Sequence, residues 1–153
     1  MALSRLVLMK GLVSLFDGDS FPDSYEGAAE NFSKVINGYA LSITPTSVNF
    51  ELAREEFVSS FVENRNKESI EILIDAVKWY CGVLTMGMQT PGYVVYSPTG
   101  NIALTTGMIA VSERSKLGMS GEDWADAVSQ IIDSYFRTGK VLQVETGVVT
   151  PWS

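Results

Sequence analysis

The sequence contains no histidine and a single cysteine, Cys81. Without histidine, the chain lacks the usual base of Ser–His and Cys–His nucleophile pairs and the usual ligand of catalytic zinc. One cysteine cannot form a disulfide within the chain, which fits a reducing compartment, and we expect Cys81 to be a small buried apolar residue. The glycine motifs that cradle phosphates are also missing from the sequence. These absences predict a protein that is not an enzyme, with no catalytic residue, no cofactor and no small-molecule substrate.

One group of acidic residues near the start of the chain could suggest a metal site. Asp17, Asp19 and Asp23 resemble the beginning of a calcium loop, but Phe21 and Pro22 stand where such a loop needs an acid and a glycine. We interpret Asp17 and Asp19 as turn residues and Asp23 as a helix cap. The sequence therefore predicts no metal site.

Charged residues are few, at 19% of the 153 residues, and their balance is −7. An acidic chain lacks the surplus of Lys and Arg that drives binding to nucleic acid or to an anionic membrane. Arg5 and Lys10 interrupt the apolar N-terminal segment, so it does not form the core of a signal peptide. Prolines and glycines break the long uncharged run before it reaches the length of a membrane span. We therefore expect neither nucleic acid nor a membrane as the main partner. Unless the protein is part of a larger particle, we expect it in the cytoplasm.

What the sequence does contain is helical periodicity, strongest from Lys67 to Met88. Apolar residues in the first half of this stretch fall on one helical face, which predicts an amphipathic helix. The second half, from Trp79 to Met88, carries no charge, and we expect it to be buried on every side. Truncation of Trp79 or Leu73 should therefore destabilise the fold.

Similar patterns before and after this stretch predict a mainly α domain that spans residues 1–153. We expect about six helices, arranged as three αα-hairpins in a compact bundle, with an extended C-terminal tail at residues 140–153. Strand-forming residues between Pro and Gly predict a small β element near residues 92–97 and 141–150.

The first and last helical pairs also align with each other at an offset of 96 residues. Gly11 matches Gly107, Ala29 matches Ala125, and the end of each pair carries a tyrosine, Tyr39 or Tyr135. A true internal repeat would explain this alignment. Any two amphipathic helices whose apolar stripes are in phase would explain it equally well.

An uncharged run from Trp79 to Ser112 is the most unusual feature of the sequence. Its middle and the C-terminal tail carry apolar and aromatic residues in segments that we expect to be extended. Such strands either pair with each other or offer open edges and apolar patches to another chain. The candidate partner-binding residues are Tyr93, Val94, Val95, Tyr96, Val148, Val149 and Trp152.

The last helix and the tail resemble a group of small virion structural proteins of tailed bacteriophages. The residues that carry this resemblance are Trp124-Ala125, Ala127-Val128, Ile131-Ile132, Tyr135-Phe136, Thr138-Gly139, Val141 and Thr146-Gly147-Val148-Val149-Thr150-Pro151. The resemblance implies a structural protein of the neck, tail or baseplate, located in the virion and assembled in the host cytoplasm. Its expected partners are copies of itself in a ring and other virion proteins. The alternatives are a capsid decoration protein and a soluble cytoplasmic adaptor that binds a protein partner.

Overall fold

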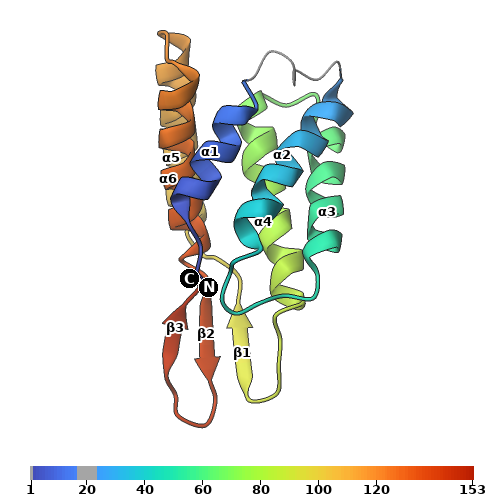
Figure 1. Ribbon diagram of the computed structural model, residues 1–153, viewed down its shortest axis with the longest axis vertical. Helices are drawn as coiled ribbons and strands as arrows, with labels where there is room; N and C mark the ends of the chain where they lie inside the picture. Colours follow the sequence, from blue (N-terminus) through green and yellow to red (C-terminus); the bar gives the residue numbers. More distant parts are fainter. Residues whose placement is uncertain (1, 17–23) are drawn as a thin grey trace.

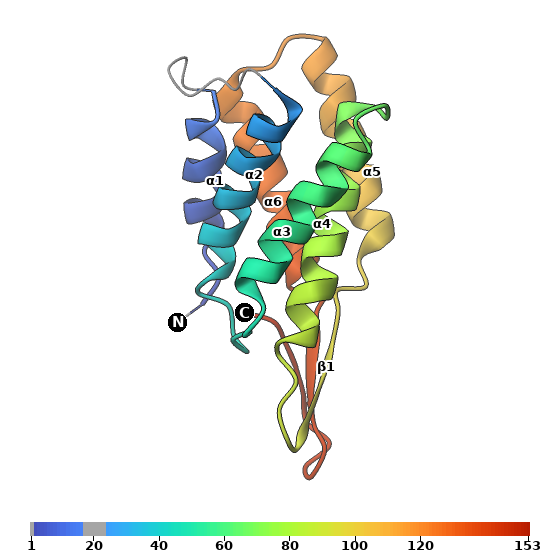
Figure 2. The ribbon, with the colours of Figure 1, turned by 90° about the vertical axis from the view of Figure 1, so that its right-hand side faces the viewer.

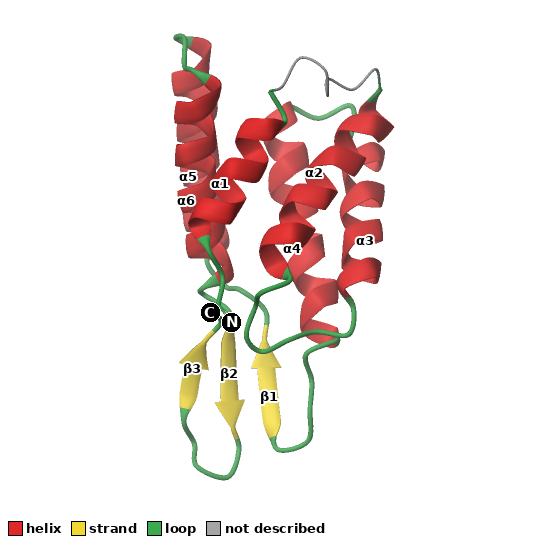
Figure 3. Cartoon of the chain, in the orientation of Figure 1, coloured by secondary structure: helices red, strands yellow, loops and turns green. Residues whose placement is uncertain are grey.

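The computed structural model describes residues 2–16 and 24–153, and in this part of the chain it is mainly α with a small β element (Figures 1 and 3). The helices are α1 (Arg5–Ser14), α2 (Tyr25–Ala40), α3 (Phe50–Glu63), α4 (Ser69–Met86), α5 (Asn101–Lys116) and α6 (Gly121–Phe136). The strands are β1 (Tyr93–Tyr96), β2 (Lys140–Gln143) and β3 (Val149–Pro151). The predicted mainly α fold with six helices and a β element is therefore confirmed.

The helices form three hairpins, α1–α2, α3–α4 and α5–α6, as the sequence predicts. The first helix of each hairpin also contacts the second helix of another: α1 lies against α6, α3 against α2, and α5 against α4. Figure 2 shows the helices as a bundle of roughly parallel and antiparallel rods. Helices α2, α4 and α6 carry most of the buried helical side chains. They form the inner layer of the bundle, and α1, α3 and α5 cover it.

Helix α4 is the most deeply buried element, although it is not buried on every side. Leu73, Val77, Tyr80 and Cys81 belong to the core, and the predicted burial of Cys81 is confirmed. Trp79 is 57% exposed and Met86 is 65% exposed. The expectation that the second half of this helix is buried all round is therefore wrong. Residues seven apart share a helical face, and this face of α4 points to solvent.

The β element is one antiparallel sheet in the order β1–β2–β3, which extends from one end of the bundle (Figure 1). In the register, Val95 pairs with Val141 and Val141 pairs with Thr150. Thr90 to Tyr93 form the turn that leads into β1, with Gly92 at φ 84°. A positive φ at this turn position favours glycine because it lacks a Cβ. The two extended segments thus pair within the chain, and the tail folds back into a hairpin.

The offset of 96 residues between the two helical pairs is visible in the structure. Helices α2 and α6 have equal lengths at this offset, and each begins after a serine whose hydroxyl accepts a hydrogen bond from a backbone N–H three residues later. Gly11 packs against Val35, and Gly107 packs against Ile131 at the same offset. A shared phase of apolar stripes does not require matching glycine contacts, so these contacts favour the repeat.

Candidate interaction surface

Exposed apolar side chains are concentrated in the uncharged run between Trp79 and Ser112. The large exposed side chains of this run are Trp79, Met86, Tyr93, Val94, Tyr96, Ile102 and Ile109. They lie on α4, β1 and α5, which follow one another along the chain. A monomer gains nothing from exposing so many apolar groups, and such surface is typical of contacts with another molecule.

One face of the sheet is mostly apolar. Side chains alternate between the two faces of a strand, so the register places six residues on the same face. This face, called here the Tyr96 face, consists of Val94, Tyr96, Lys140, Leu142, Val149 and Pro151. All of them are exposed except Leu142, which is partly exposed. Lys140 is the charged residue of this face.

The opposite face of the sheet turns toward the bundle at one end. Val95 is only 5% exposed, and Val141 packs against the core. Tyr93 and Val148 lie farther toward the tip and are exposed, and Thr150 is exposed although it pairs with Val141. The sheet is therefore anchored through one face and one end, and its remaining surface is open to solvent.

Five of the seven predicted partner-binding residues are exposed, and two are not. Tyr93, Val94, Tyr96, Val148 and Val149 are exposed on the sheet or beside it. Val95 and Trp152 are buried in the core, so they do not offer a contact surface. For these two residues the sequence-based prediction is wrong, because it treated each extended segment as a surface strand along its whole length.

Trp152 is the largest fully buried side chain among the described residues. Its backbone N–H donates to the Gly139 carbonyl at 2.9 Å, and its indole ring covers Gly139, where a Cβ would overlap the ring. The ring also meets Phe136 edge to face, with centroids 6.3 Å apart. Within the described residues, the indole Nε1 has no hydrogen-bond partner. The chain thus buries this tryptophan for its apolar ring, and the C-terminal residues form part of the core.

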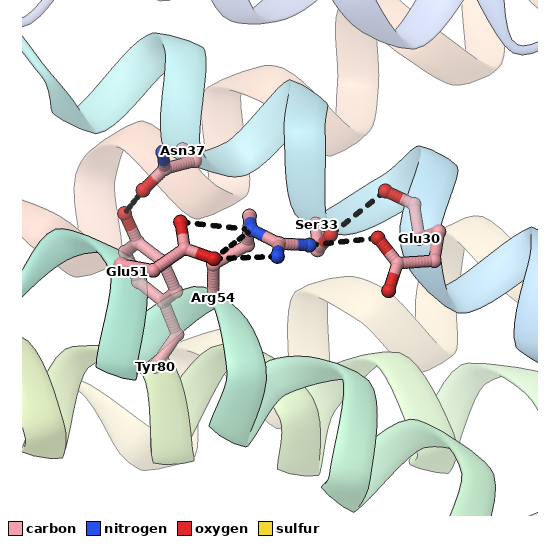
Figure 4. Close-up of polar contacts among 6 residues, drawn as sticks. All are labelled: Glu30, Ser33, Asn37, Glu51, Arg54 and Tyr80. Carbon is pink, nitrogen blue, oxygen red and sulfur yellow. Dashed lines mark hydrogen bonds and ion pairs between the residues drawn. The ribbon is translucent and has the colours of Figure 1, made fainter.

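The hairpins are also joined by a partly exposed polar stripe on α2, formed by Glu30, Ser33 and Asn37, that the sequence analysis missed (Figure 4). Arg54 of α3 donates to Glu30 at 2.7 Å, and the Tyr80 hydroxyl of α4 donates to Asn37 at 2.7 Å. Ser33 lies between these two contacts and donates to the Glu30 backbone carbonyl. The acid and the asparagine of α2 therefore receive donors from the two helices of the next hairpin, and the serine lies between them.

Helix α6 carries the same stripe at an offset of 96 residues. Arg5 of α1 donates to Asp126 at 2.7 Å and to the Ser129 hydroxyl at 3.3 Å. The Tyr39 hydroxyl of α2 donates to Asp133 at 2.7 Å. Asp126, Ser129 and Asp133 thus occupy the positions of the acid, serine and asparagine on α2, and the Ser129 hydroxyl also donates to the backbone carbonyl of the acid. Comparing the polar positions of the repeat, as well as the apolar ones, would have revealed this stripe in the sequence.

The ionisable groups of the two stripes are shifted in directions that their contacts explain. The hydrogen bond from Arg5 lowers the pKa of Asp126, and the hydrogen bond from Arg54 lowers the pKa of Glu51. Burial raises the pKa of Tyr39, and the Asp133 carboxylate, which accepts a hydrogen bond from the Tyr39 hydroxyl, raises it further. Burial likewise raises the pKa of the Tyr80 hydroxyl. Each shift favours the protonation state in which the contact forms. The contacts of Asp126, Tyr39 and Tyr80 join different hairpins, whereas the contact of Glu51 with Arg54 lies within α3.

A cavity of about 790 Å³ opens at the end of the bundle away from the sheet. Its described lining includes Phe16, Tyr25, Phe32, Leu73 and Trp124. The rings of Phe16 and Trp124 meet edge to face, with centroids 5.4 Å apart. Phe16 and Ser24 both line the cavity, and the residues between them in the sequence lie outside the described part of the chain, so we assign no function to the cavity.

Chemical sites are not prominent in the described residues. Residues 2–16 and 24–153 contain no group of three or more Cys, Asp or Glu side chains placed to hold a metal ion. The prediction about Asp17, Asp19 and Asp23 falls outside these ranges. Burial raises the pKa of the Cys81 thiol well above its usual value, which keeps the thiol protonated. Among the described helices, none combines the length and apolar character that crossing a membrane requires.

Neither a protein-family model, nor a curated protein, nor a solved structure matches this chain.

Proposed function

We propose that this protein is a non-enzymatic structural subunit that assembles with copies of itself through its uncharged surface. The observation that carries the proposal is the set of large exposed apolar side chains between Trp79 and Ile109, which includes residues of β1 in the sheet that extends from the bundle. Aromatic residues such as Trp and Tyr are enriched where protein interfaces contribute most to binding.

The surface divides into two parts that a ring could use. The sheet surface consists of Val94, Tyr96 and Val149 on the Tyr96 face. The helix surface consists of Trp79 and Met86 on α4 with Ile102 and Ile109 on α5. A ring forms when one patch of each subunit contacts a different patch of the next. We propose that the sheet surface of one copy contacts the helix surface of its neighbour.

The resemblance to small virion proteins of tailed bacteriophages supports a proposal for where this assembly is located. We propose that the protein belongs to the neck, tail or baseplate of such a virion and contacts other virion proteins there. A capsid decoration protein is the alternative within the same class, and a cytoplasmic adaptor is the alternative outside it. In purified particles, mass spectrometry should find many copies of the chain per particle for a ring subunit. Its absence from particles would favour the adaptor.

Sedimentation velocity tests the self-assembly directly. The wild-type chain should form species larger than a monomer as its concentration rises, and Tyr96→Lys or Ile102→Lys should shift it back toward a monomer. Leu6→Lys is the matched control, since Leu6 is 53% exposed on α1 and belongs to neither surface. A wild-type chain that stays monomeric at high concentration contradicts the proposal.

A further inference from the structure

The outer edge of β1 is occupied by a glutamine side chain. Backbone groups in an antiparallel strand point alternately toward the partner strand and away from it. The Val144 N–H donates to the Gly92 carbonyl at 3.0 Å, so Val94 and Tyr96 direct their backbone groups toward β2. Tyr93 and Val95 therefore direct theirs toward the outer edge.

Gln89 satisfies the outward backbone groups of Val95 as a neighbouring strand would. Its Oε1 accepts from the Val95 N–H at 3.1 Å, and its Nε2 donates to the Val95 carbonyl at 2.9 Å. The same Nε2 also lies 3.3 Å from the Thr85 carbonyl near the end of α4. Next to this contact, the Tyr93 N–H donates to the Thr90 carbonyl at 3.1 Å. The loop between α4 and β1 thus lies along the edge of β1 (Figure 1).

The outer edge of β3 is closed by different means. The bonds from Gln143 to Val148 and from Trp152 to Gly139 place the outward positions of this strand at Val149 and Pro151. Pro151 has no N–H to donate to a further strand. Beyond it, Ser153 exchanges two backbone hydrogen bonds with Thr44, at 2.7 and 3.1 Å. Val149 alone is too short a site for a stable strand pairing.

We infer that Gln89 acts as a built-in edge strand that prevents other chains from pairing with β1. An unprotected edge pairs readily with strands of other molecules, and proteins close such edges with side chains, prolines or loops. With both edges of this sheet closed, contacts with other molecules are made by side chains on its faces. The inference rests on backbone hydrogen bonds and does not depend on the proposed ring.

Amide hydrogen exchange of the monomer at low concentration tests this role. In Gln89→Ala the Val95 N–H loses its acceptor, and we expect it to exchange roughly five- to tenfold faster, the effect of one lost hydrogen bond. Gln143→Ala is the matched control, because the Gln143 side chain lies on the central strand and accepts a hydrogen bond from the Thr146 hydroxyl in the turn between β2 and β3. An unchanged exchange rate of the Val95 N–H in Gln89→Ala overturns the inference.

The opened edge should also change how the protein associates. At higher concentration, Gln89→Ala should show the infrared amide signal of intermolecular β-sheet, and adding Pro151→Ala should strengthen it by freeing an N–H on the other edge. The Gln143→Ala control should resemble the wild type. If Gln89→Ala exchanges faster at Val95 but forms no intermolecular sheet, Gln89 only braces the strand and the protective role is overturned. Neither readout depends on the proposed ring. The exchange rate is measured on the monomer, and the infrared signal of each variant is compared with that of the wild type at the same concentration.

Discussion

Two tryptophans, both placed in apolar surroundings by their sequence, have opposite positions in the structure. Trp79 lies in the middle of an uncharged helix and is 57% exposed, whereas Trp152 lies next to the end of the chain and is 0% exposed. The sequence of a helix does not say which of its faces is covered, because that depends on the neighbouring elements. The burial of Trp152 also depends on packing, because only the fold places Gly139 beneath the indole ring.

The two tryptophans should therefore respond differently to truncation. Trp152→Ala leaves a large cavity beside Phe136 and Gly139, and we expect a loss of about 3–5 kcal/mol in the free energy of unfolding. Trp79→Ala removes a largely exposed side chain and should cost less than about 1 kcal/mol, close to the range of surface substitutions. Urea unfolding followed by circular dichroism measures both. Equal losses in the two variants would contradict the placement of Trp152.

The hydrogen bonds that two tyrosine hydroxyls make between the inner helices should differ in strength. Tyr39 donates to the charged Asp133, and Tyr80 donates to the neutral Asn37, both at 2.7 Å. Hydrogen bonds to charged groups contribute about 1.5–3 kcal/mol and neutral ones about 0.5–1.5 kcal/mol. We expect Tyr39→Phe to lower the free energy of unfolding more than Tyr80→Phe does. The Arg137 Nε also donates to Asp133, at 2.9 Å, so one carboxylate oxygen stays paired in Tyr39→Phe. The reverse order, measured in the same urea experiments, would contradict this ranking.

At the scale of the elements, the helices were largely predictable and the pairing of the strands was not. Helices α2 and α6 carry clear periodic patterns of their own, and the serine before α6 caps it as the local sequence suggests. Strand pairing depends on residues far apart in sequence, so the pattern of GYVVYS identified β1 but not its neighbour. The tail divides into β2 and β3 at the turn that follows Gln143, within the segment for which the sequence predicts a β element.

The candidate surface was predictable only in part, because its lack of charge is a property of the sequence whereas its exposure depends on packing. Charge is absent from the run between Trp79 and Ser112, and that absence is visible without a structure. Which side chains of the run face solvent depends on packing, as the burial of Val95 between exposed Val94 and Tyr96 illustrates. The role of Gln89 depends on two backbone groups of Val95, and no sequence pattern marks such a contact.

Glycine substitutions test the close helix contacts of the repeat. A Cβ at Gly11 would lie 2.7 Å from Val35, and one at Gly107 would lie 3.1 Å from Ile131. Both alanine variants should be less stable, Gly11→Ala the more so, within the range of about 1–3 kcal/mol typical of overpacking. Gly38 has open space around its Cβ position, so Gly38→Ala should be more stable than the wild type by about 0.4–1 kcal/mol. Thermal unfolding would contradict the shared packing if Gly11→Ala and Gly38→Ala shifted stability alike.

For the whole molecule, the repeat explains how three hairpins form one core. The stripe on α2 receives donors from the α3–α4 hairpin, and the stripe on α6 receives donors from the α1–α2 hairpin. Helix α4 has Glu71, Ile74 and Lys78 where the alignment of Tyr39 with Tyr80 would place the stripe. The α4–α5 contact therefore lacks this set of polar residues, and it is flanked by the exposed apolar side chains of both helices.

The central claim is that the sheet surface of one copy contacts the helix surface of another. A mixing experiment tests it with two variants, one carrying Tyr96→Lys and Val149→Lys, the other carrying Met86→Lys and Ile102→Lys. Each variant retains one intact surface, so each alone should be monomeric and unable to form a ring. Circular dichroism should first show that both keep the helical signal of the wild type.

Mixed in equal amounts, the two variants should form a dimer of one copy of each, because one intact sheet surface meets one intact helix surface. Sedimentation equilibrium measures the mass of this species, and the wild-type chain under the same conditions provides the reference for larger assemblies. A 1:1 dimer that grows no further is the predicted result. A mixture that remains monomeric while the wild-type chain assembles would contradict the pairing of these two surfaces.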